Sequence, residues 1–273
     1  MEYAYHTKTI WCGHDGKRIF GIAFIPQREG KVPLVIFSHE LGYNHETGIP
    51  YGQFLASRGY AFYTFDYCGG SIDSVRNRSD GRTVGMSMIT EADDLRAVIG
   101  AAKKWDFVDP DAVVLLGGSQ GALVAALNAC ARLGEVRGLM LMYPALIAMP
   151  DVHKRFGERK AVPHDYGMFG HWIQVGRKYA LDIWDLNFYD MFAHYPGNVL
   201  LLHGDHDRAV DISYSKRAAR MFPRCEFHVI TNGGHIFHGQ PQKDAARYIL
   251  GYLDKLFVHR KEKKSAGADF GAK

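Results

Sequence analysis

The stretch VVLLGGSQGALVAAL, residues 113–127, joins an apolar run to a run of helix-forming residues through a glycine-rich corner. The apolar run has the length and composition of a buried strand, and the residues after the corner have the 3.6-residue apolar spacing of a helix. The corner reads GGSQG, with the serine at position 119, and so contains the pattern Gly-x-Ser-x-Gly. Between a strand and a helix this pattern predicts a nucleophile elbow.

The backbone of such an elbow explains why Ser119 stands among glycines. The serine adopts a strained conformation, the flanking glycines relieve the crowding, and the hydroxyl lies at the positive end of the following helix. The alternative is a turn that binds phosphate or has only a structural role. A phosphate-binding loop requires Gly-Lys-Ser or Gly-Lys-Thr, which this corner lacks. We therefore predict that Ser119 is a nucleophile.

Short apolar runs alternate with helix-like segments along the rest of the chain. Near-continuous apolar strands separated by helices predict an α/β fold, with a mostly parallel sheet covered on both faces. Ligands on such sheets bind at the carboxyl ends of the strands. The expected strands are 18–25, 32–39, 61–67, 113–118, 138–143, 198–204 and 225–231, and the expected helices are 90–105, 120–133, 213–222 and 241–257.

Residues 146–189 break this alternation and are rich in aromatic side chains. A long stretch without a simple period is usually functional or disordered, and the aromatic content argues against disorder. We expect this segment to be an inserted lid over the carboxyl edge of the sheet. The remaining organisation is then one core in two parts, 1–145 and 190–258, followed by a flexible basic tail at 259–273.

A nucleophilic serine needs a base and a carboxylate that orients the base. In folds with this elbow the chain order is serine, acid, histidine. Asp207 and His235 follow two later strands in that order. Asp205 is the alternative acid, but it lies closer to the turn and is better suited to capping it. His238 is the alternative base, and we keep it as a candidate pocket residue.

Acyl transfer also requires hydrogen-bond donors for the oxyanion of the transition state. The backbone N–H of Gln120, directly after the nucleophile, is one expected donor. The second is expected in the loop after strand 32–39, where Leu41 is the predicted donor and His39 is a further candidate for substrate contact.

Composition excludes several other classes of protein. A length of 273 residues with 47% apolar and 23% charged residues fits one large soluble α/β domain. The net charge of +4 arises largely from lysine and arginine within 259–264, so no basic face for nucleic acid is expected. The sequence shows neither a signal peptide nor a membrane span, and we expect a cytoplasmic protein that binds no membrane.

The cysteines and the HGDHD stretch (203–207) raise the question of a metal site. The four cysteines are scattered without a C-x-x-C pair, which indicates reduced, mostly buried residues. His203, His206 and Asp207 are possible ligands, yet the other strand ends supply no second ligand pair. We therefore expect no metal and no cofactor.

Taken together, these features resemble the α/β-hydrolase superfamily over about residues 5–258, and within it the bacterial cinnamoyl and feruloyl esterases. The resemblance implies a triad of Ser119, Asp207 and His235, and oxyanion amides from Leu41 and Gln120. It also implies a lid inserted between the sixth and seventh strands of the sheet. The stretches that carry it are SHELGYN (38–44), FDYCGGS (65–71), MSMITEADDLRAVI (86–99), LLGGSQGALVAAL (115–127), IWDLNFYD (183–190), HGDHDRAV (203–210) and GGHIF (233–237).

The lid of that group contacts the phenolic end of hydroxycinnamate esters, and the counterparts here are Asp151 and Tyr166. One residue departs from the group, because Glu40 stands where a glycine usually follows the histidine of the oxyanion loop. A carboxylate that pointed inward would oppose an oxyanion. Either Glu40 points away, paired with a cation of the lid or a loop, or the oxyanion hole is less well formed.

The resemblance implies a serine carboxylesterase that acts through an acyl-enzyme on hydroxycinnamate or other small aromatic or short-chain esters. Its expected partner is a small-molecule ester, and exposed lid aromatics would favour a homodimer. The alternatives are an acyltransferase or a peptidase with the same triad, and a noncatalytic binding protein on the same scaffold. A noncatalytic relative usually lacks the base or the acid, and both are present here.

Overall fold

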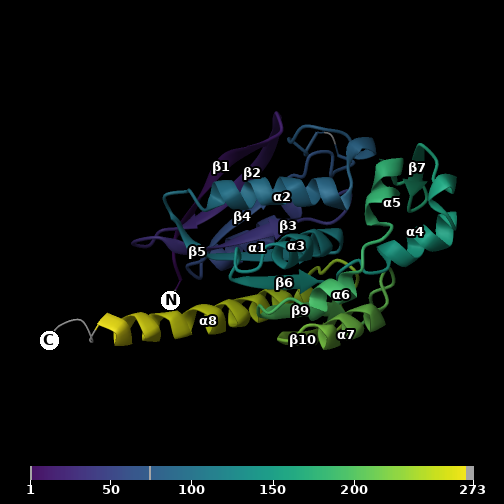
Figure 1. The fold of residues 1–273 in the computed structure, drawn as a ribbon. Coiled ribbons are helices and arrows are strands. Elements are labelled where there is room, and N and C mark those ends of the chain that lie inside the picture. Colours follow the sequence, from purple (N-terminus) through teal and green to yellow (C-terminus); the bar gives the residue numbers. More distant parts are fainter. Residues whose placement is uncertain (1, 74, 269–273) are drawn as a thin grey trace.

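An eight-stranded sheet forms the centre of the protein, which the computed structural model describes for residues 2–73 and 75–268 (Figure 1). In spatial order its strands are β1 (Tyr5–His14), β2 (Lys17–Pro26), β4 (Ala61–Phe65), β3 (Val32–Ser38), β5 (Val108–Gly118), β6 (Gly138–Met142), β9 (Val199–Gly204) and β10 (Cys225–Ile230). The pairs β1–β2 and β2–β4 are antiparallel, and all other neighbours in this sheet are parallel. The expected mostly parallel α/β sheet is confirmed.

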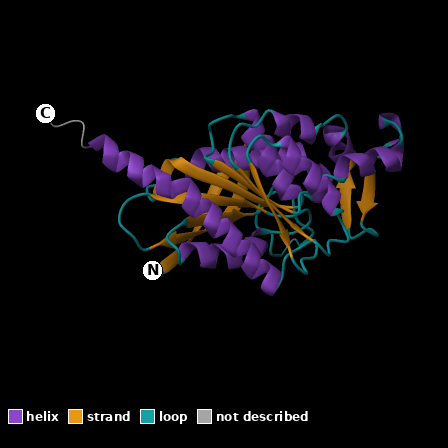
Figure 2. Cartoon of the chain, turned by 90° about the horizontal axis from the view of Figure 1, so that it is seen from below, coloured by secondary structure: helices purple, strands orange, loops and turns teal. Residues whose placement is uncertain are grey.

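Helices cover both faces of this sheet (Figure 2). Alternate residues of each buried strand face opposite layers, as the two-residue period of a strand requires. In β3, for example, Leu34 and Ile36 belong to one apolar core, and Val35 and Phe37 belong to the other. The first core includes α2 (Met88–Ala102), α3 (Gln120–Ala131), α6 (Phe188–Ala193) and α7 (Ile212–Met221), and the second includes α1 (Ile49–Ala56) and α8 (Gln240–Ala268).

The segment 146–189, termed the insert segment below, lies between β6 and β9, the sixth and seventh strands of the large sheet along the chain. Its strands β7 and β8 pair antiparallel as a separate hairpin. Figure 1 shows this group at one end of the large sheet. Its elements are α4 (Ala148–Phe156), η3 (Arg159–Ala161), β7 (Asp165–Met168), β8 (Ile173–Gly176) and α5 (Arg177–Ile183), and the remaining short helices of the chain are η1 (His45–Gly48) and η2 (Thr83–Gly85).

Three core elements, β1, α1 and α6, were not expected from the sequence. Strand β1 lies at the edge of the sheet and most of its side chains are exposed, so it lacks the apolar run of a buried strand. Helix α1 has only eight residues and contains Pro50 and Gly52, both poor helix formers. The elements with long apolar patterns lie near their expected positions, although β5 begins at Val108 and α8 ends at Ala268, beyond the expected bounds.

The carboxyl-terminal region is more helical than the expected tail at 259–273. Helix α8 continues through Ala268, and residues 269–273 lie outside the described part of the chain. Within the described ranges, no helix offers the sustained apolar stretch that a bilayer crossing requires.

Candidate active site

The elbow at Ser119 has the strained backbone that its sequence predicts. Ser119 has φ 52° and ψ −115°, a left-handed conformation that costs free energy for a residue with a side chain. Neighbouring backbone leaves no space for side chains on the glycines at either side. A Cβ on Gly117 would collide with the carbonyl of Gly121, and a Cβ on Gly121 would collide with the carbonyl of Ser38. The tight turn therefore requires both glycines.

Ser119, His235 and Asp207 form a hydrogen-bonded relay just beyond the carboxyl ends of β5, β10 and β9. The Ser119 Oγ lies 2.8 Å from His235 Nε2, and His235 Nδ1 lies 2.8 Å from Asp207 Oδ2. This order lets His235 accept the serine proton while Asp207 holds the opposite ring nitrogen as a donor. Asp205 lies outside the relay, in an exposed pair with His206.

The carboxylate of Asp207 is held by four donors. Its Oδ1 accepts from the backbone N–H groups of Ala209 and Val210, both at 2.9 Å. Its Oδ2 accepts from His235 and lies 3.2 Å from His203 Nε2. Burial opposes ionisation of Asp207, but the hydrogen bonds from His203 and His235 outweigh it and hold the pKa of Asp207 well below its ordinary value. The carboxylate is therefore charged at neutral pH and able to stabilise an imidazolium.

His203, from the same HGDHD stretch, contacts the acid of the relay. Its Nε2 lies near two acceptors, Asp207 Oδ2 and the Val210 carbonyl at 3.0 Å, and therefore carries the proton. Its Nδ1 accepts from the Ser215 hydroxyl at 2.8 Å. The side chain is fully buried. In the part of the chain that is described, no group of three or more His, Cys, Asp or Glu is placed to hold a metal ion.

Two backbone N–H groups are available next to Ser119. Leu41 and Gln120 both line the cavity that contains the serine. Gln120 is the first residue of α3, so its N–H has no acceptor within the helix. The hydrogen bonds of the described residues include no acceptor for the backbone N–H of Leu41. Both groups are therefore available as hydrogen-bond donors, and their role toward an oxyanion stays a prediction.

His39 orients the Leu41 amide from behind. Its Nε2 accepts from the backbone N–H of Tyr67 at 3.2 Å, so the proton is on Nδ1, which donates to the Glu40 carbonyl at 2.8 Å. The N–H of Tyr43 donates to the same carbonyl. Because a trans peptide directs its carbonyl and N–H to opposite sides, holding the Glu40 carbonyl aims the Leu41 N–H. Burial lowers the pKa of His39 and keeps the ring neutral.

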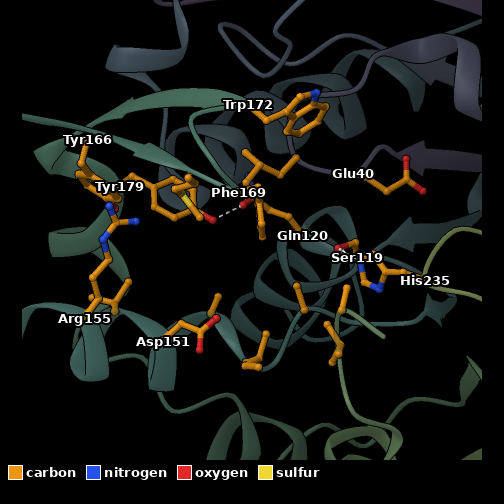
Figure 3. A pocket seen from close by; sticks show the side chains of 18 of the residues that line it. Glu40, Ser119, Gln120, Asp151, Arg155, Tyr166, Phe169, Trp172, Tyr179 and His235 are labelled. Carbon is orange, nitrogen blue, oxygen red and sulfur yellow. Dashed lines mark hydrogen bonds between the residues drawn. The ribbon is translucent and has the colours of Figure 1, made fainter. Parts of the chain in front are cut away.

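Glu40 is buried and its carboxylate points away from the centre of the cavity (Figure 3). Its Oε1 accepts from the Tyr143 hydroxyl at 2.9 Å and lies against the Cα of Gly118. Burial, followed by the nearby Glu40 charge, raises the pKa of Tyr143, which therefore stays a protonated donor. Of the two alternatives for Glu40, the structure shows the outward orientation, but the partner is a phenol and not a cation.

A cavity of about 660 Å³ extends from Ser119 to the insert segment. Asp151 and Tyr166, predicted as substrate contacts, both line it. His39 and His238 do not line it: His39 is buried behind the oxyanion loop, and His238 is exposed to solvent. The lining residues are Glu40, Leu41, Tyr43, Ser119, Gln120, Ala145, Ile147, Ala148, Asp151, Val152, Lys154, Arg155, Phe156, Tyr166, Met168, Phe169, Trp172, Tyr179, Ala209, Val210, His235 and Ile236.

The side chain of Gln120 connects the elbow to two other elements. Its Nε2 donates to Glu91 of α2 at 2.7 Å, and its Oε1 accepts from the Tyr179 hydroxyl of α5 at 2.6 Å. Glu91 is buried, and burial raises its pKa to about 8. The carboxyl is therefore mostly protonated at neutral pH. No pattern in the sequence indicated this network, because its three members come from separate segments.

We expect Glu91→Gln to make the protein more stable than the wild type at alkaline pH. Ionisation of Glu91 favours the unfolded chain, where its pKa is the ordinary 4.5, over the folded chain, where it is about 8. The stability that Glu91 contributes is therefore complete below about pH 4.5 and is lost as the pH rises to about 8. We expect urea unfolding to show that the free energy of unfolding of the variant, relative to that of the wild type, rises by on the order of 3 kcal/mol across this pH interval.

Glu29→Gln is the control for this experiment, because Glu29 is exposed. Its free energy of unfolding should follow that of the wild type at every pH. Parallel pH profiles for the wild type and Glu91→Gln would show that Glu91 is not a buried neutral acid.

Comparison with known proteins bears on the family and the fold of the chain. The model of a family described as "Alpha/beta hydrolase family" matches residues 35–247, whereas a search of curated proteins gave no match. Similar solved structures include Est1E from Butyrivibrio proteoclasticus with ferulic acid bound (21% identity, 89% of this chain and 98% of that chain, TM-score 0.79). They also include the alpha/beta hydrolase GrgF from Penicillium sp. sh18 (14% identity, 93% and 99%, TM-score 0.74). A third is the esterase EaEST from Exiguobacterium antarcticum (16% identity, 90% and 100%, TM-score 0.67).

Proposed function

The chain belongs to the alpha/beta hydrolase family, and from this premise we propose that it hydrolyses carboxylic esters through an acyl-enzyme formed on Ser119. The observation that carries the proposal is the relay at Ser119, in which 2.8 Å separates the hydroxyl from His235 and 2.8 Å separates His235 from Asp207. A strained serine next to a base that a buried carboxylate orients is an arrangement suited to nucleophilic catalysis.

In the first half of the reaction, Ser119 Oγ attacks the ester carbonyl carbon while His235 Nε2 takes the serine proton. The negative charge moves to the carbonyl oxygen, where the N–H groups of Leu41 and Gln120 donate to it. The intermediate then collapses, the C–O bond to the alcohol breaks, and His235 returns the proton to the leaving oxygen. Asp207 stabilises the imidazolium between these two transfers.

In the second half, His235 removes a proton from water, and the hydroxide attacks the acyl-enzyme carbonyl. The same two amides stabilise the second oxyanion. Collapse releases the carboxylic acid and returns the proton from His235 to Ser119. No other group is needed to balance the protons.

For the substrate we propose esters of hydroxycinnamic or other small aromatic acids, or short-chain esters. The cavity supports this class because aliphatic and aromatic side chains form most of its wall. The solved structure of Est1E holds ferulic acid, and its fold is similar. We also propose that the insert segment acts as a lid and that Asp151 and Tyr166 contact the acyl group.

A panel of p-nitrophenyl esters and methyl hydroxycinnamates tests this function. We expect hydrolysis of both groups, and mass spectrometry after rapid acid quenching should detect the acyl group on the peptide that contains Ser119. Turnover of short-chain esters without turnover of the hydroxycinnamates would support an esterase and contradict the proposed aromatic acyl group. Absence of turnover throughout the panel would contradict the proposed function.

A further inference from the structure

The end of the cavity remote from Ser119 carries the charges of helix α4. Asp151, Lys154 and Arg155 all line the cavity there, and Figure 3 shows Asp151 and Arg155 on the side opposite to Ser119. The catalytic relay itself does not use these side chains. Charged groups on the wall of an otherwise largely apolar cavity fix the orientation and the class of a ligand.

Arg155 is anchored by aromatic rings and not by a carboxylate. Its guanidinium carbon lies 4.9 Å from the ring centroid of Tyr166 and 5.2 Å from that of Phe156. The ion pairs of residues 2–73 and 75–268 include none for Arg155. A guanidinium stacked on a ring keeps its N–H edge free, and that edge matches the two oxygens of a carboxylate.

A second donor lies beside this cation. Tyr166 is only 6% exposed, and its hydroxyl oxygen is buried without a hydrogen-bond partner among the described residues. A buried hydroxyl that lacks a partner costs free energy, which a bound acceptor would recover. Because this oxygen has almost no accessible surface, the Tyr166 side chain must shift before the hydroxyl donates to a ligand in the cavity.

Asp151 is the carboxylate that lines the cavity at this end, and its negative charge would oppose the binding of an anion. Burial raises the pKa of Asp151, and the charge of Lys154 opposes this rise. The described ion pairs include none between Asp151 and Arg155, which is one helical turn further along α4. Two cations therefore face one acid, so the end of the cavity carries an excess of positive charge.

We propose that this cavity selects esters whose acyl group ends in a carboxylate, which Arg155 binds while the ester carbonyl lies at Ser119. The inference rests on the proposed esterase function and names its substrate class. The two oxygens of the carboxylate accept from the free edge of the guanidinium, and the Tyr166 hydroxyl donates to one of them. Asp151 weakens this binding by charge repulsion, so the two α4 residues have opposite effects on the same ligand.

Two isosteric esters provide the test. One is the methyl ester of para-carboxycinnamic acid, with its ring carboxylate free, and the other carries a carboxamide in place of that carboxylate. We expect kcat/KM for the carboxylate to exceed that for the carboxamide by about tenfold or more, as charge-assisted hydrogen bonds are stronger than neutral ones. The ratio should fall as sodium chloride screens the charges.

Variants of the two α4 residues should change this ratio in opposite directions. Arg155→Gln should bring it to about one, and Asp151→Asn should raise it above that of the wild type, because a repulsive charge is removed. Lys160→Gln is the matched control, since Lys160 pairs with Glu158 and does not line the cavity, and its ratio should equal that of the wild type. Thermal unfolding of each variant verifies that it is folded.

Hydrolysis of p-nitrophenyl acetate, which is too short to reach Arg155, distinguishes failure of carboxylate selection from failure of the proposed esterase function. An enzyme that cleaves this acetate but hydrolyses the carboxylate and carboxamide esters equally well would overturn the inference and retain the esterase. A ratio that Arg155→Gln leaves unchanged would do the same. An enzyme that cleaves none of the esters would remove both proposals.

Discussion

Ser119→Ala is expected to lower kcat/KM for ester hydrolysis by about four to six orders of magnitude. The variant loses the oxygen that would form the covalent bond, and the cavity offers no second hydroxyl in hydrogen-bond contact with His235. Alanine at this position must still adopt φ 52°, so the turn keeps its strain while its chemistry is removed. Initial rates on p-nitrophenyl acetate measure this loss, with enough of the variant in the assay to detect a rate far below that of the wild type.

Ser213→Ala is the matched control, because Ser213 is an exposed residue at the start of α7. It should keep the wild-type rate and should still react with a fluorophosphonate that labels activated serines, whereas Ser119→Ala should remain unlabelled. Residual activity of Ser119→Ala within tenfold of the wild type would place the nucleophile elsewhere.

Asp207→Asn is expected to lower kcat/KM by about four orders of magnitude. In the wild type, Oδ1 accepts two backbone N–H groups and Oδ2 accepts from two histidines. An asparagine can present an oxygen to only one of these pairs, and its amide N–H₂ then faces donors at the other. With the oxygen toward the backbone, His235 must place its proton on Nε2 and can no longer accept from Ser119.

The neighbouring acid of the same stretch is the control for this variant. Asp205→Asn changes an exposed carboxylate that contacts His206, and it should keep activity within about twofold of the wild type. A comparison of kcat/KM for the two variants decides which aspartate orients His235. Equal losses would show that charge near the site, and not the relay geometry, controls the rate.

The positions of the relay residues could be predicted from the sequence because the topology brings the strand ends together. Ser119, Asp207 and His235 each follow a strand with a strong apolar pattern, and parallel strands end at one edge of the sheet. The amides of Leu41 and Gln120 could be named as candidates for the same reason, since Leu41 lies in the loop after β3 and Gln120 begins α3 directly after β5. These predictions needed only the order of the strands and the edge of the sheet at which they end.

Contacts that depend on how helices and loops pack were not predictable. His203 was considered as a metal ligand, but its ring serves Asp207, a role that depends on Ser215 of α7 and on the path of the intervening loop. The bonds of Glu91 with Gln120 likewise depend on how α2 packs on α3. His39 was predicted near the substrate because it lies on the oxyanion loop, yet the backbone places its ring behind that loop. A single sequence contains no periodic pattern that indicates such contacts.

The contact between Glu40, in the loop after β3, and Gly118, at the end of β5, couples the residue types that these two positions can hold. A Cβ at position 118 would occupy the space of the Glu40 carboxylate and approach the Tyr143 hydroxyl at 3.1 Å. A side chain at position 118 would therefore require the Glu40 carboxylate to shift from its present contact with Tyr143, so the conformation of Glu40 depends on glycine at 118. Libraries that randomise the loop alone vary position 40 and leave position 118 unchanged. Recombination with relatives should therefore exchange positions 40, 118 and 143 together.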